Sequence, residues 1–84
     1  MSFYVYIIHC ADDSFYTGYT ADLETRITQH KTGKGSRWTK SHGFKEYTYI
    51  TFEMKKVALH MERVIKGWKV SKKMDLFKAY GIYT

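Results

Sequence analysis

The sequence predicts one α/β domain, of the α+β kind, in which a small three-stranded antiparallel sheet is flanked by helices. The chain has 84 residues, a length that holds one small hydrophobic core and leaves no room for a second domain. Three stretches show the two-residue alternation of strands, and two longer stretches repeat apolar residues at helical spacing. A single domain covering residues 1–84 is therefore expected.

The first two strands are expected to form a hairpin near the start of the chain. Residues 3–9 (FYVYIIH) alternate two sets of side chains, as a strand does. The polar segment at 11–14 (ADDS) has the length of a hairpin connection, and residues 15–19 return antiparallel to the first strand. In that second strand Tyr16 and Gly18 share a face.

A helix is expected to follow the hairpin, and then a basic loop. Thr20 is the expected N-cap, acidic residues occupy the first turn, and Gly33 ends the helix after Lys31 or Thr32. Residues 31–44 (KTGKGSRWTKSHGF) mix glycines with cationic side chains, so they predict a loop with one helical turn near Ser36.

The second half of the chain predicts one more strand and two more helices. Residues 45–52 alternate as a third strand. Gly67 lies near the end of a long helix, and Ser71 is the expected cap of a short last helix with Met74 and Phe77 facing inward. The apolar face of the long helix is marked by Met54, Val57, Ala58, Met61, Ile65 and Trp68.

The charge is uneven along the chain and indicates a polyanionic partner. The net charge is +6, but residues 1–30 carry one basic and four acidic side chains, whereas residues 31–84 carry thirteen basic and four acidic ones. Clustered Lys and Arg bind nucleic acid through counterion release. Solubility alone is the alternative explanation of this charge.

Membrane and secreted classes receive no support from the sequence. No apolar run approaches the roughly 20 residues of a spanning helix, and no signal or lipidation segment is visible. Cys10 is the single cysteine, so it has no internal disulfide partner, which favours a cytoplasmic location.

Three charged or polar side chains lie at or beside apolar helix faces. Arg26 and His30 share the spacing of Leu23 and Ile27, and Glu62 borders the apolar face of the long helix. On pattern alone, Arg26 could extend past the sheet edge, His30 could pack, and Glu62 could be solvated. The alternative is that these residues carry chemistry.

Four segments in order resemble the GIY-YIG nuclease superfamily, in particular its small stand-alone bacterial members. Residues 4–7 (YVYI) and 16–18 (YTG) resemble the two halves of the motif, with ten positions between their matching tyrosines. The helix carrying 22–26 (DLETR) and the later helix carrying 58–66 (ALHMERVIK) follow in the family's order. The sequence Gly-Ile-Tyr also occurs at 81–83, but no second half of the motif and no arginine-bearing helix follow it, so it is not the motif.

The resemblance implies roles for individual residues. Tyr6 and Tyr16 are the two motif phenols, Tyr6 being the usual candidate for general base, and both hydroxyls are expected to reach water in a catalytic cleft. Gly18 is the motif glycine, expected to let substrate or a helix approach the strand. Arg26 is expected to hold the scissile phosphate, and His30 to contact phosphate or the nucleophile.

The resemblance also implies a metal, and the basic residues imply a nucleic-acid surface. Glu62 matches the family's single metal-binding carboxylate, which would hold one Mg²⁺ or Mn²⁺. Lys34, Arg37, Lys40 and Lys66 are the expected phosphate contacts. Trp38 is expected to close the core, with stacking on a base as the alternative.

The expected activity is that of a metal-dependent endonuclease with low sequence specificity or with structure selectivity, in DNA repair or processing. DNA is favoured over RNA as the partner, and a protein partner that supplies specificity stays open. One alternative is a binding module with weak or lost catalysis, because Tyr4 and Thr17 depart from the motif and the chain has no asparagine, which many family nucleases use. A second alternative is a protein-interaction adaptor that uses the tyrosine-rich face.

Overall fold

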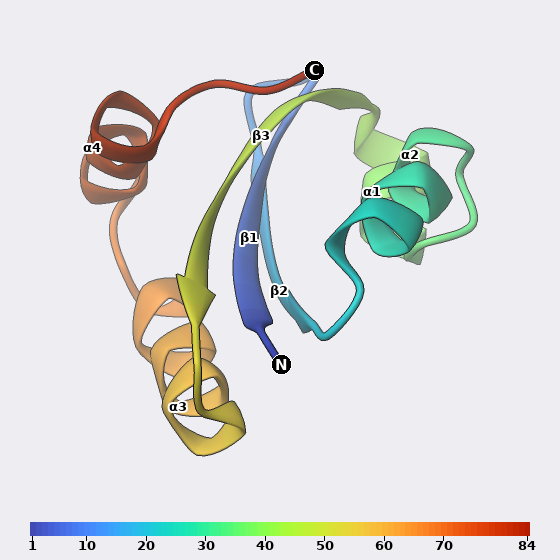
Figure 1. The fold of residues 1–84 in the computed structure, drawn as a ribbon. Coiled ribbons are helices and arrows are strands. Elements are labelled where there is room, and N and C mark those ends of the chain that lie inside the picture. Colours follow the sequence, from blue (N-terminus) through green and yellow to red (C-terminus); the bar gives the residue numbers. More distant parts are fainter.

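A three-stranded antiparallel sheet lies between two pairs of helices, which confirms the predicted fold class (Figure 1). The computed structural model describes all residues, 1–84. The strand order is β2-β1-β3. The elements are β1 (Phe3–Cys10), β2 (Phe15–Thr20), α1 (Leu23–Lys31), α2 (Arg37–His42), β3 (Phe44–Phe52), α3 (Lys55–Lys66) and α4 (Val70–Tyr80).

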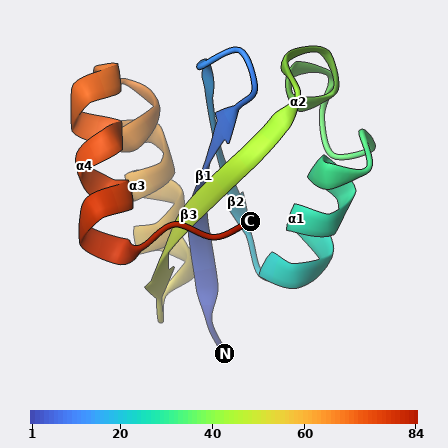
Figure 2. The same cartoon turned by 90° about the horizontal axis from the view of Figure 1, so that it is seen from above.

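The two faces of the central strand β1 belong to two separate hydrophobic clusters. Val5 and Ile7 pack with residues of α3 and α4 on one face. Tyr6 and Ile8 pack with Ile27 of α1 on the other face. Figure 2 shows this layering, with α3 and α4 on one side of the sheet and α1 and α2 on the other. Strand alternation thus places Tyr6 on the α1 side.

The predicted cap of α1 is wrong by two residues. Asp22, and not Thr20, is the N-cap, and its Oδ1 accepts a hydrogen bond of 3.3 Å from the backbone N–H of Thr25. The Thr20 hydroxyl instead accepts from the N–H of Asp22 at 3.0 Å. Thr20 is the last residue of β2, so its backbone is committed to the sheet and the helix begins after it.

The last helix is longer than predicted, and Ser71 does not cap it. Helix α4 has 11 residues and begins after Lys69, so Ser71 lies inside the first turn. The helical turn expected near Ser36 is confirmed as the six-residue helix α2, whose N-cap is Ser36, and Gly67 is the C-cap of α3.

Trp38 is exposed, so its expected role in the core is wrong. Its side chain stands 45% exposed, and its ring stacks on that of His42 with centroids 4.0 Å apart. Helix α2 is too short to bury two adjacent positions. It turns Thr39 toward the core, which leaves Trp38 facing solvent.

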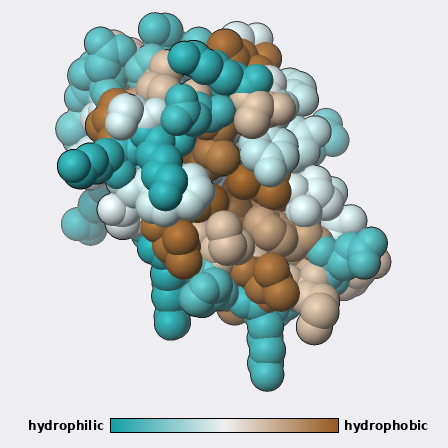
Figure 3. Space-filling view, turned by 90° about the vertical axis from the view of Figure 1, so that its left-hand side faces the viewer, coloured by the Kyte–Doolittle hydropathy of each residue, from teal (hydrophilic) through white to brown (hydrophobic).

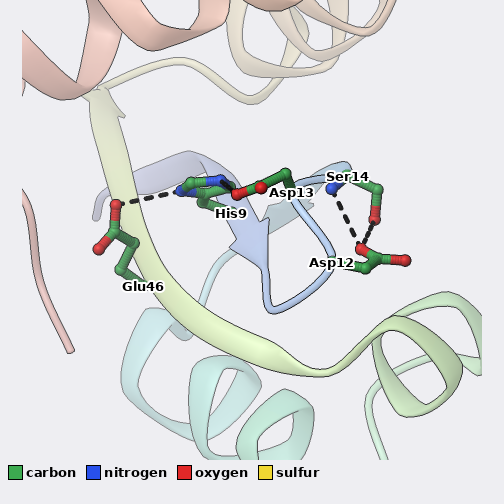
Figure 4. Close-up of polar contacts among 5 residues, drawn as sticks. All are labelled: His9, Asp12, Asp13, Ser14 and Glu46. Carbon is green, nitrogen blue, oxygen red and sulfur yellow. Dashed lines mark hydrogen bonds and ion pairs between the residues drawn. The ribbon is translucent and has the colours of Figure 1, made fainter.

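His9 ties the hairpin to β3 on the face opposite Tyr6 (Figure 4). Its Nε2 lies 2.9 Å from Asp13 Oδ1, its Nδ1 lies 3.2 Å from Glu46 Oε2, and its ring stacks on Phe15 at 4.7 Å. This cluster fixes the turn between β1 and β2, in which Asp13 adopts a left-handed φ of 66°.

The tail after α4 returns to the sheet on the α1 side (Figure 2). Tyr83 forms a β-bridge with Tyr47, with backbone N–O distances of 2.8 and 2.9 Å. The Gly-Ile-Tyr at 81–83 therefore contacts β3 and takes no part in the hairpin. Figure 3 shows the opposite face, over α3 and α4, where hydrophobic side chains gather between hydrophilic ones. None of the helices has the length and apolar character needed to cross a bilayer.

Candidate active site

A chain of hydrogen bonds links β1, α1 and α2 on the α1 side of the sheet. Tyr6 Oη lies 2.8 Å from His30 Nε2, and His30 Nδ1 lies 2.8 Å from Thr39 Oγ1. The Thr39 hydroxyl lies 2.9 Å from Ser36 Oγ. All three of Tyr6, His30 and Thr39 are buried. The structure therefore holds these side chains in fixed positions relative to one another.

In this series of hydrogen bonds the donor and acceptor of each bond can be assigned, because every buried donor needs an acceptor. The Nε–H of Arg26 points to Tyr6 Oη at 3.4 Å, and arginine can only donate. The Tyr6 hydroxyl proton then has His30 Nε2 as its acceptor, so His30 carries its own proton on Nδ1 and donates it to Thr39. The reverse direction would leave the buried Tyr6 proton without an acceptor, which is costly. Thr39 thus fixes the tautomer that leaves Nε2 free to accept.

Burial keeps both members of the Tyr6 and His30 pair neutral. Desolvation raises the pKa of Tyr6 to about 12, and the nearby charge of Glu62 adds to the rise while Arg26 opposes it. Burial lowers the pKa of His30 to about 4, helped by the positive charge of Arg26. The expectation that both tyrosine hydroxyls reach water is wrong for Tyr6, which is only 1% exposed.

Two glycines make room for this pair. Gly18 lies opposite Tyr6 in the strand register, and a Cβ at Gly18 would stand 2.3 Å from Tyr6 Oη. The group that approaches the motif glycine is therefore the Tyr6 phenol, and not a substrate or a helix as expected. A Cβ at Gly35 would likewise stand 2.5 Å from His30 Nδ1. Both glycines are required for close packing.

Arg26 and Tyr16 form the accessible edge of the same site. The Arg26 side chain is partly exposed, and its Nη1 donates to Gln29 Oε1 at 3.0 Å. The hydrogen bond to Tyr6 is the main cause that raises the pKa of Arg26. Tyr16 is also partly exposed, with its ring centroid 5.1 Å from that of His30 and 6.3 Å from that of Tyr6.

Glu62 lies on α3, the helix packed against the other face of the sheet. Its side chain is 20% exposed, and one carboxylate oxygen lies 3.7 Å from Lys66 Nζ. Its charge is one of the causes that raise the pKa of Tyr6, so it acts electrostatically on the site. No three His, Cys, Asp or Glu side chains converge on one point. A lone carboxylate fits Mg²⁺ or Mn²⁺, since Mg²⁺ usually keeps several waters and takes one or two protein carboxylates.

The predicted phosphate contacts lie on exposed surface on both sides of the sheet. Lys34 is exposed on the connection between α1 and α2, which packs against the buried His30, and Arg37 and Lys40 are exposed on α2. Lys66 is exposed on α3, where it faces Glu62. The structure therefore places three of the four on the α1 side and one beside the candidate metal ligand.

The sequence does not predict three residues that contact or adjoin the candidate site residues. Thr39 and Gly35 lie against His30, and Gln29 accepts a hydrogen bond from Arg26. Thr39 occupies the third position of a helix capped by Ser36, where a side chain turns back toward the cap. That cap is visible in the sequence, and it is the one signal that could have identified Thr39. Nothing in the sequence marks the distant contact between Thr39 and His30.

We expect stability to fall between pH 6.5 and pH 4 because of His30. Its pKa of about 4 in the folded chain lies below the ordinary 6.5, so the unfolded chain binds a proton first as the pH falls. The stabilisation is complete above pH 6.5 and is lost progressively toward pH 4, by up to about 3 kcal/mol. Urea unfolding across this range measures the loss.

Two comparisons separate His30 from the other titrating groups. His30→Gln should reduce the slope of stability against pH, whereas His60→Gln, at an exposed position of α3, should retain it. Between pH 7 and pH 5, the His30 imidazole signals in an NMR titration should move by no more than about a tenth of their full titration shift, since the pKa of His30 is about 4. Titration of His30 near pH 6.5 would contradict the buried neutral assignment.

The comparisons with known proteins agree on one family. The GIY-YIG catalytic domain family matches residues 2–75. A UPF0213 protein of Oceanobacillus iheyensis is 42% identical over 76 residues, covering 89% of this chain and 88% of that protein. UPF0213 protein BH0048 of Halalkalibacterium halodurans is 39% identical over 82 residues, covering 96% and 87%. The solution NMR structure of UPF0213 protein BH0048 from Bacillus halodurans has a TM-score of 0.58 at 38% identity and covers 96% of this chain and 87% of its own. The chain therefore belongs to the GIY-YIG catalytic domain family, and its relatives are small stand-alone UPF0213 proteins.

Proposed function

We propose that the chain is a metal-dependent endonuclease that hydrolyses phosphodiester bonds in DNA. The observation that carries this proposal is the contact of one phenol with both a base and a cation: Tyr6 Oη meets His30 Nε2 and Arg26 Nε. Membership of a nuclease superfamily supports a nucleic-acid substrate. We also propose low sequence specificity, because the exposed basic side chains of Lys34, Arg37 and Lys40 are suited to phosphate contacts, which carry no sequence information.

Arg26 is the group that binds the scissile phosphate. Its Nε–H is directed to Tyr6 and one Nη1 donor to Gln29, so three of its five N–H donors remain for phosphoryl oxygens. A planar guanidinium binds two oxygens of one phosphate at once, which an ammonium group cannot do. The two protein contacts hold the guanidinium in place before substrate arrives.

Tyr6 and His30 act together to accept the proton of the attacking water. With a pKa of about 12, roughly one Tyr6 in 10⁵ is ionised at pH 7, so a resident phenolate is not the base. Tyr6 instead takes the proton of water as it passes its own proton to His30 Nε2, a step that requires the partly exposed Arg26 edge to open, because the resting structure keeps Tyr6 away from solvent. The charge of Arg26 lowers the pKa of His30, so a phosphate bound to Arg26 offsets that charge and strengthens the acceptor.

Glu62 is the residue that would hold Mg²⁺ or Mn²⁺. The ion, when bound, supplies positive charge to the phosphoryl and leaving oxygens. Glu62 itself is held away from open solvent, with Lys66 as its neighbour. Lys66 Nζ lies 3.7 Å from the carboxylate and adds positive charge beside it, near the proposed path of the nucleic acid.

Cleavage of a substrate panel tests the proposal. Duplex, flap, junction and single-stranded DNA, with matched RNA, are incubated with Mg²⁺, with Mn²⁺ and with EDTA. We expect metal-dependent cuts in DNA, strongest in one of the branched or single-stranded forms and spread over many sequences. Cleavage of RNA alone would overturn the choice of DNA, and sharp cutting at one sequence would overturn low specificity.

A binding module of the same fold is the second candidate, favoured by the absence of asparagine from the chain. It predicts affinity for the same substrates with no cleavage in either metal. A protein-interaction adaptor predicts neither affinity nor cleavage. The panel therefore distinguishes the three functions when binding and cleavage are both measured.

Affinity for DNA should fall steeply as salt rises. The excess charge consists of exposed Lys and Arg, and contact with about four to six phosphates gives a log–log slope of roughly −3 to −5. Fluorescence anisotropy with EDTA present measures it. The triple variant Lys34→Gln, Arg37→Gln, Lys40→Gln should make the slope shallower by up to about 3. The triple variant Lys69→Gln, Lys72→Gln, Lys78→Gln, at exposed positions of α4 and its N-cap, is the matched control and should leave the slope unchanged. A parent slope near zero would contradict a nucleic-acid partner.

A further inference from the structure

A groove lined by tyrosine rings lies on the flank of α1 away from Arg26 and His30. It has a volume of about 650 Å³ and runs between α1 and the sheet. We call it the tyrosine groove and define it by the rings of Tyr4, Tyr47, Tyr49 and Tyr83 together with Leu23 and Ile27 of α1. Its size is in the range of pockets that take small molecules or parts of larger ligands.

The four rings make one continuous aromatic surface. The centroid of Tyr49 lies 6.0 Å from that of Tyr4, 6.3 Å from that of Tyr47 and 5.2 Å from that of Tyr83. Tyr83 is also 5.6 Å from Tyr47, and it is 39% exposed. Its backbone bridge to Tyr47 fixes the tail in place. The ring planes within these pairs differ by 29° to 72°, so the rings offer separate faces and edges, and an exposed ring face is a surface on which a nucleobase stacks.

The charges around the groove favour a base over a phosphate at one end. Asp22 and Glu24 line it near the start of α1, and carboxylates repel phosphate but accept hydrogen bonds from the amino group of a base such as cytosine. Lys31 lines it seven residues after Glu24, about 10 Å along the helix axis. Its Nζ donates to the carbonyl oxygen of Thr84 at 2.8 Å. The groove thus offers acceptors at one end and a cation at the other.

One residue that lines the groove lies two positions along β1 from a residue of the candidate active site. Tyr4 and Tyr6 lie on the same face of β1, about 7 Å apart along the strand. Tyr4 lines the groove, whereas Tyr6 contacts Arg26. A strand with its scissile phosphate on Arg26 would reach the groove by passing the start of α1, so the base in the groove would lie a few nucleotides from the cut. Only an unpaired base can leave its stack to enter such a groove.

We propose that the tyrosine groove is a nucleobase subsite that takes one unpaired, amino-bearing base close to the scissile phosphate. This inference rests on the proposed function, and it assigns the substrate class as DNA with a single-stranded or extruded base near the cut. Tyr83 supplies the most accessible ring of the groove, and Glu24 is an acceptor at its edge. Selectivity for structure over sequence then follows from the need for a free base.

The test is a double-mutant cycle that combines removal of the Tyr83 ring with removal of one base from a DNA probe. The probe is a short fluorescent oligodeoxycytidylate, measured by anisotropy with EDTA so that no cleavage occurs, and a second set carries one abasic position moved along the strand. Tyr83→Ala should weaken binding of the intact probe about 10-fold, since stacking on one ring contributes of the order of 5- to 150-fold per base. Abasic substitution at one position should cost the parent a similar factor and cost Tyr83→Ala little more.

Two control variants test whether the loss of binding in Tyr83→Ala is due to the Tyr83 ring. Tyr80→Ala removes an exposed tyrosine of α4 outside the groove and should bind like the parent. Tyr83→Phe keeps the ring and loses the hydroxyl that donates to the Tyr80 carbonyl at 3.3 Å, and it should also bind like the parent. Equal weakening by Tyr83→Ala and Tyr80→Ala, or no coupling between Tyr83 and any abasic position, would overturn the subsite.

Failure of the subsite and failure of the proposed function give different results. If the parent cleaves DNA but the cycle shows no coupling, the nuclease proposal stands and the subsite is wrong. If the cycle shows coupling but the parent never cleaves, the subsite stands in a binding module. Melting curves for all variants establish that each is folded.

Discussion

Arg26→Ala should reduce single-turnover cleavage by at least about 10² to 10³, or roughly 3 to 4 kcal/mol of transition-state stabilisation. The guanidinium is partly exposed and fixed by Tyr6 at 3.4 Å and by Gln29 at 3.0 Å, so it is aimed before substrate binds. A preorganised cation of this kind stabilises charge that develops in the reaction. Single-turnover cleavage of the best panel substrate, with protein in excess, measures the loss.

Two matched variants distinguish a phosphate clamp from general loss of charge. Arg63→Ala removes the same net charge from an exposed position of α3 and should lower cleavage little. Arg26→Lys keeps the charge but lacks the paired donors, so it should recover only part of the rate. Full activity in Arg26→Lys would show that a point charge suffices and would contradict the clamp.

The sequence predicts the elements of the active site better than their contacts. The structure places Tyr6 opposite Gly18, a register that the sequence does not predict. Strand alternation and helical spacing predict that Tyr6 lies on the first strand and that Arg26 and His30 lie at or beside the inward face of α1. These are local periodicities. The hydrogen bond from His30 to Thr39 joins α1 to α2, which the sequence predicts as one helical turn in a basic loop without indicating what it contacts.

The errors at Thr20, Ser71 and Trp38 share a physical cause. Each residue was assigned by its local preference, as a cap or as a large apolar side chain, and tertiary contacts override such preferences. The backbone of Thr20 belongs to β2, and α4 already begins after Lys69. Helix α2 has only one buried position, which Thr39 fills because its hydroxyl is needed by His30.

The burial of Tyr6 could not be inferred from its place in the motif. Gly18 predicts a close approach to the strand, and the approaching group is the phenol itself, with Oη 2.3 Å from where a Cβ would lie. This contact excludes water from Tyr6 and raises its pKa to about 12. The same burial that weakens a phenolate base makes the hydrogen bond to His30 short and defined, which is why a relay is the chemistry proposed.

Glu62→Gln should abolish metal-dependent cleavage and keep the fold. The side chain is 20% exposed at the border of α3, and the amide has the shape of the carboxylate, so the melting temperature should change little. An amide oxygen without charge holds Mg²⁺ far less well than a carboxylate, so the proposed ion is lost. Cleavage should fall below detection in Mg²⁺, while affinity for DNA measured with EDTA should stay the same or rise slightly because one negative charge is gone.

The control for this variant is a carboxylate away from the site. Glu53→Gln, at the exposed turn between β3 and α3, makes the same change in net charge and should cut as fast as the parent. Glu62→Gln also removes one of the charges that raise the pKa of Tyr6, which eases transfer of the Tyr6 proton to His30. A loss of cleavage in Glu62→Gln with DNA binding intact therefore points to the metal, and cleavage at the parent's rate would show that the one-metal mechanism is wrong.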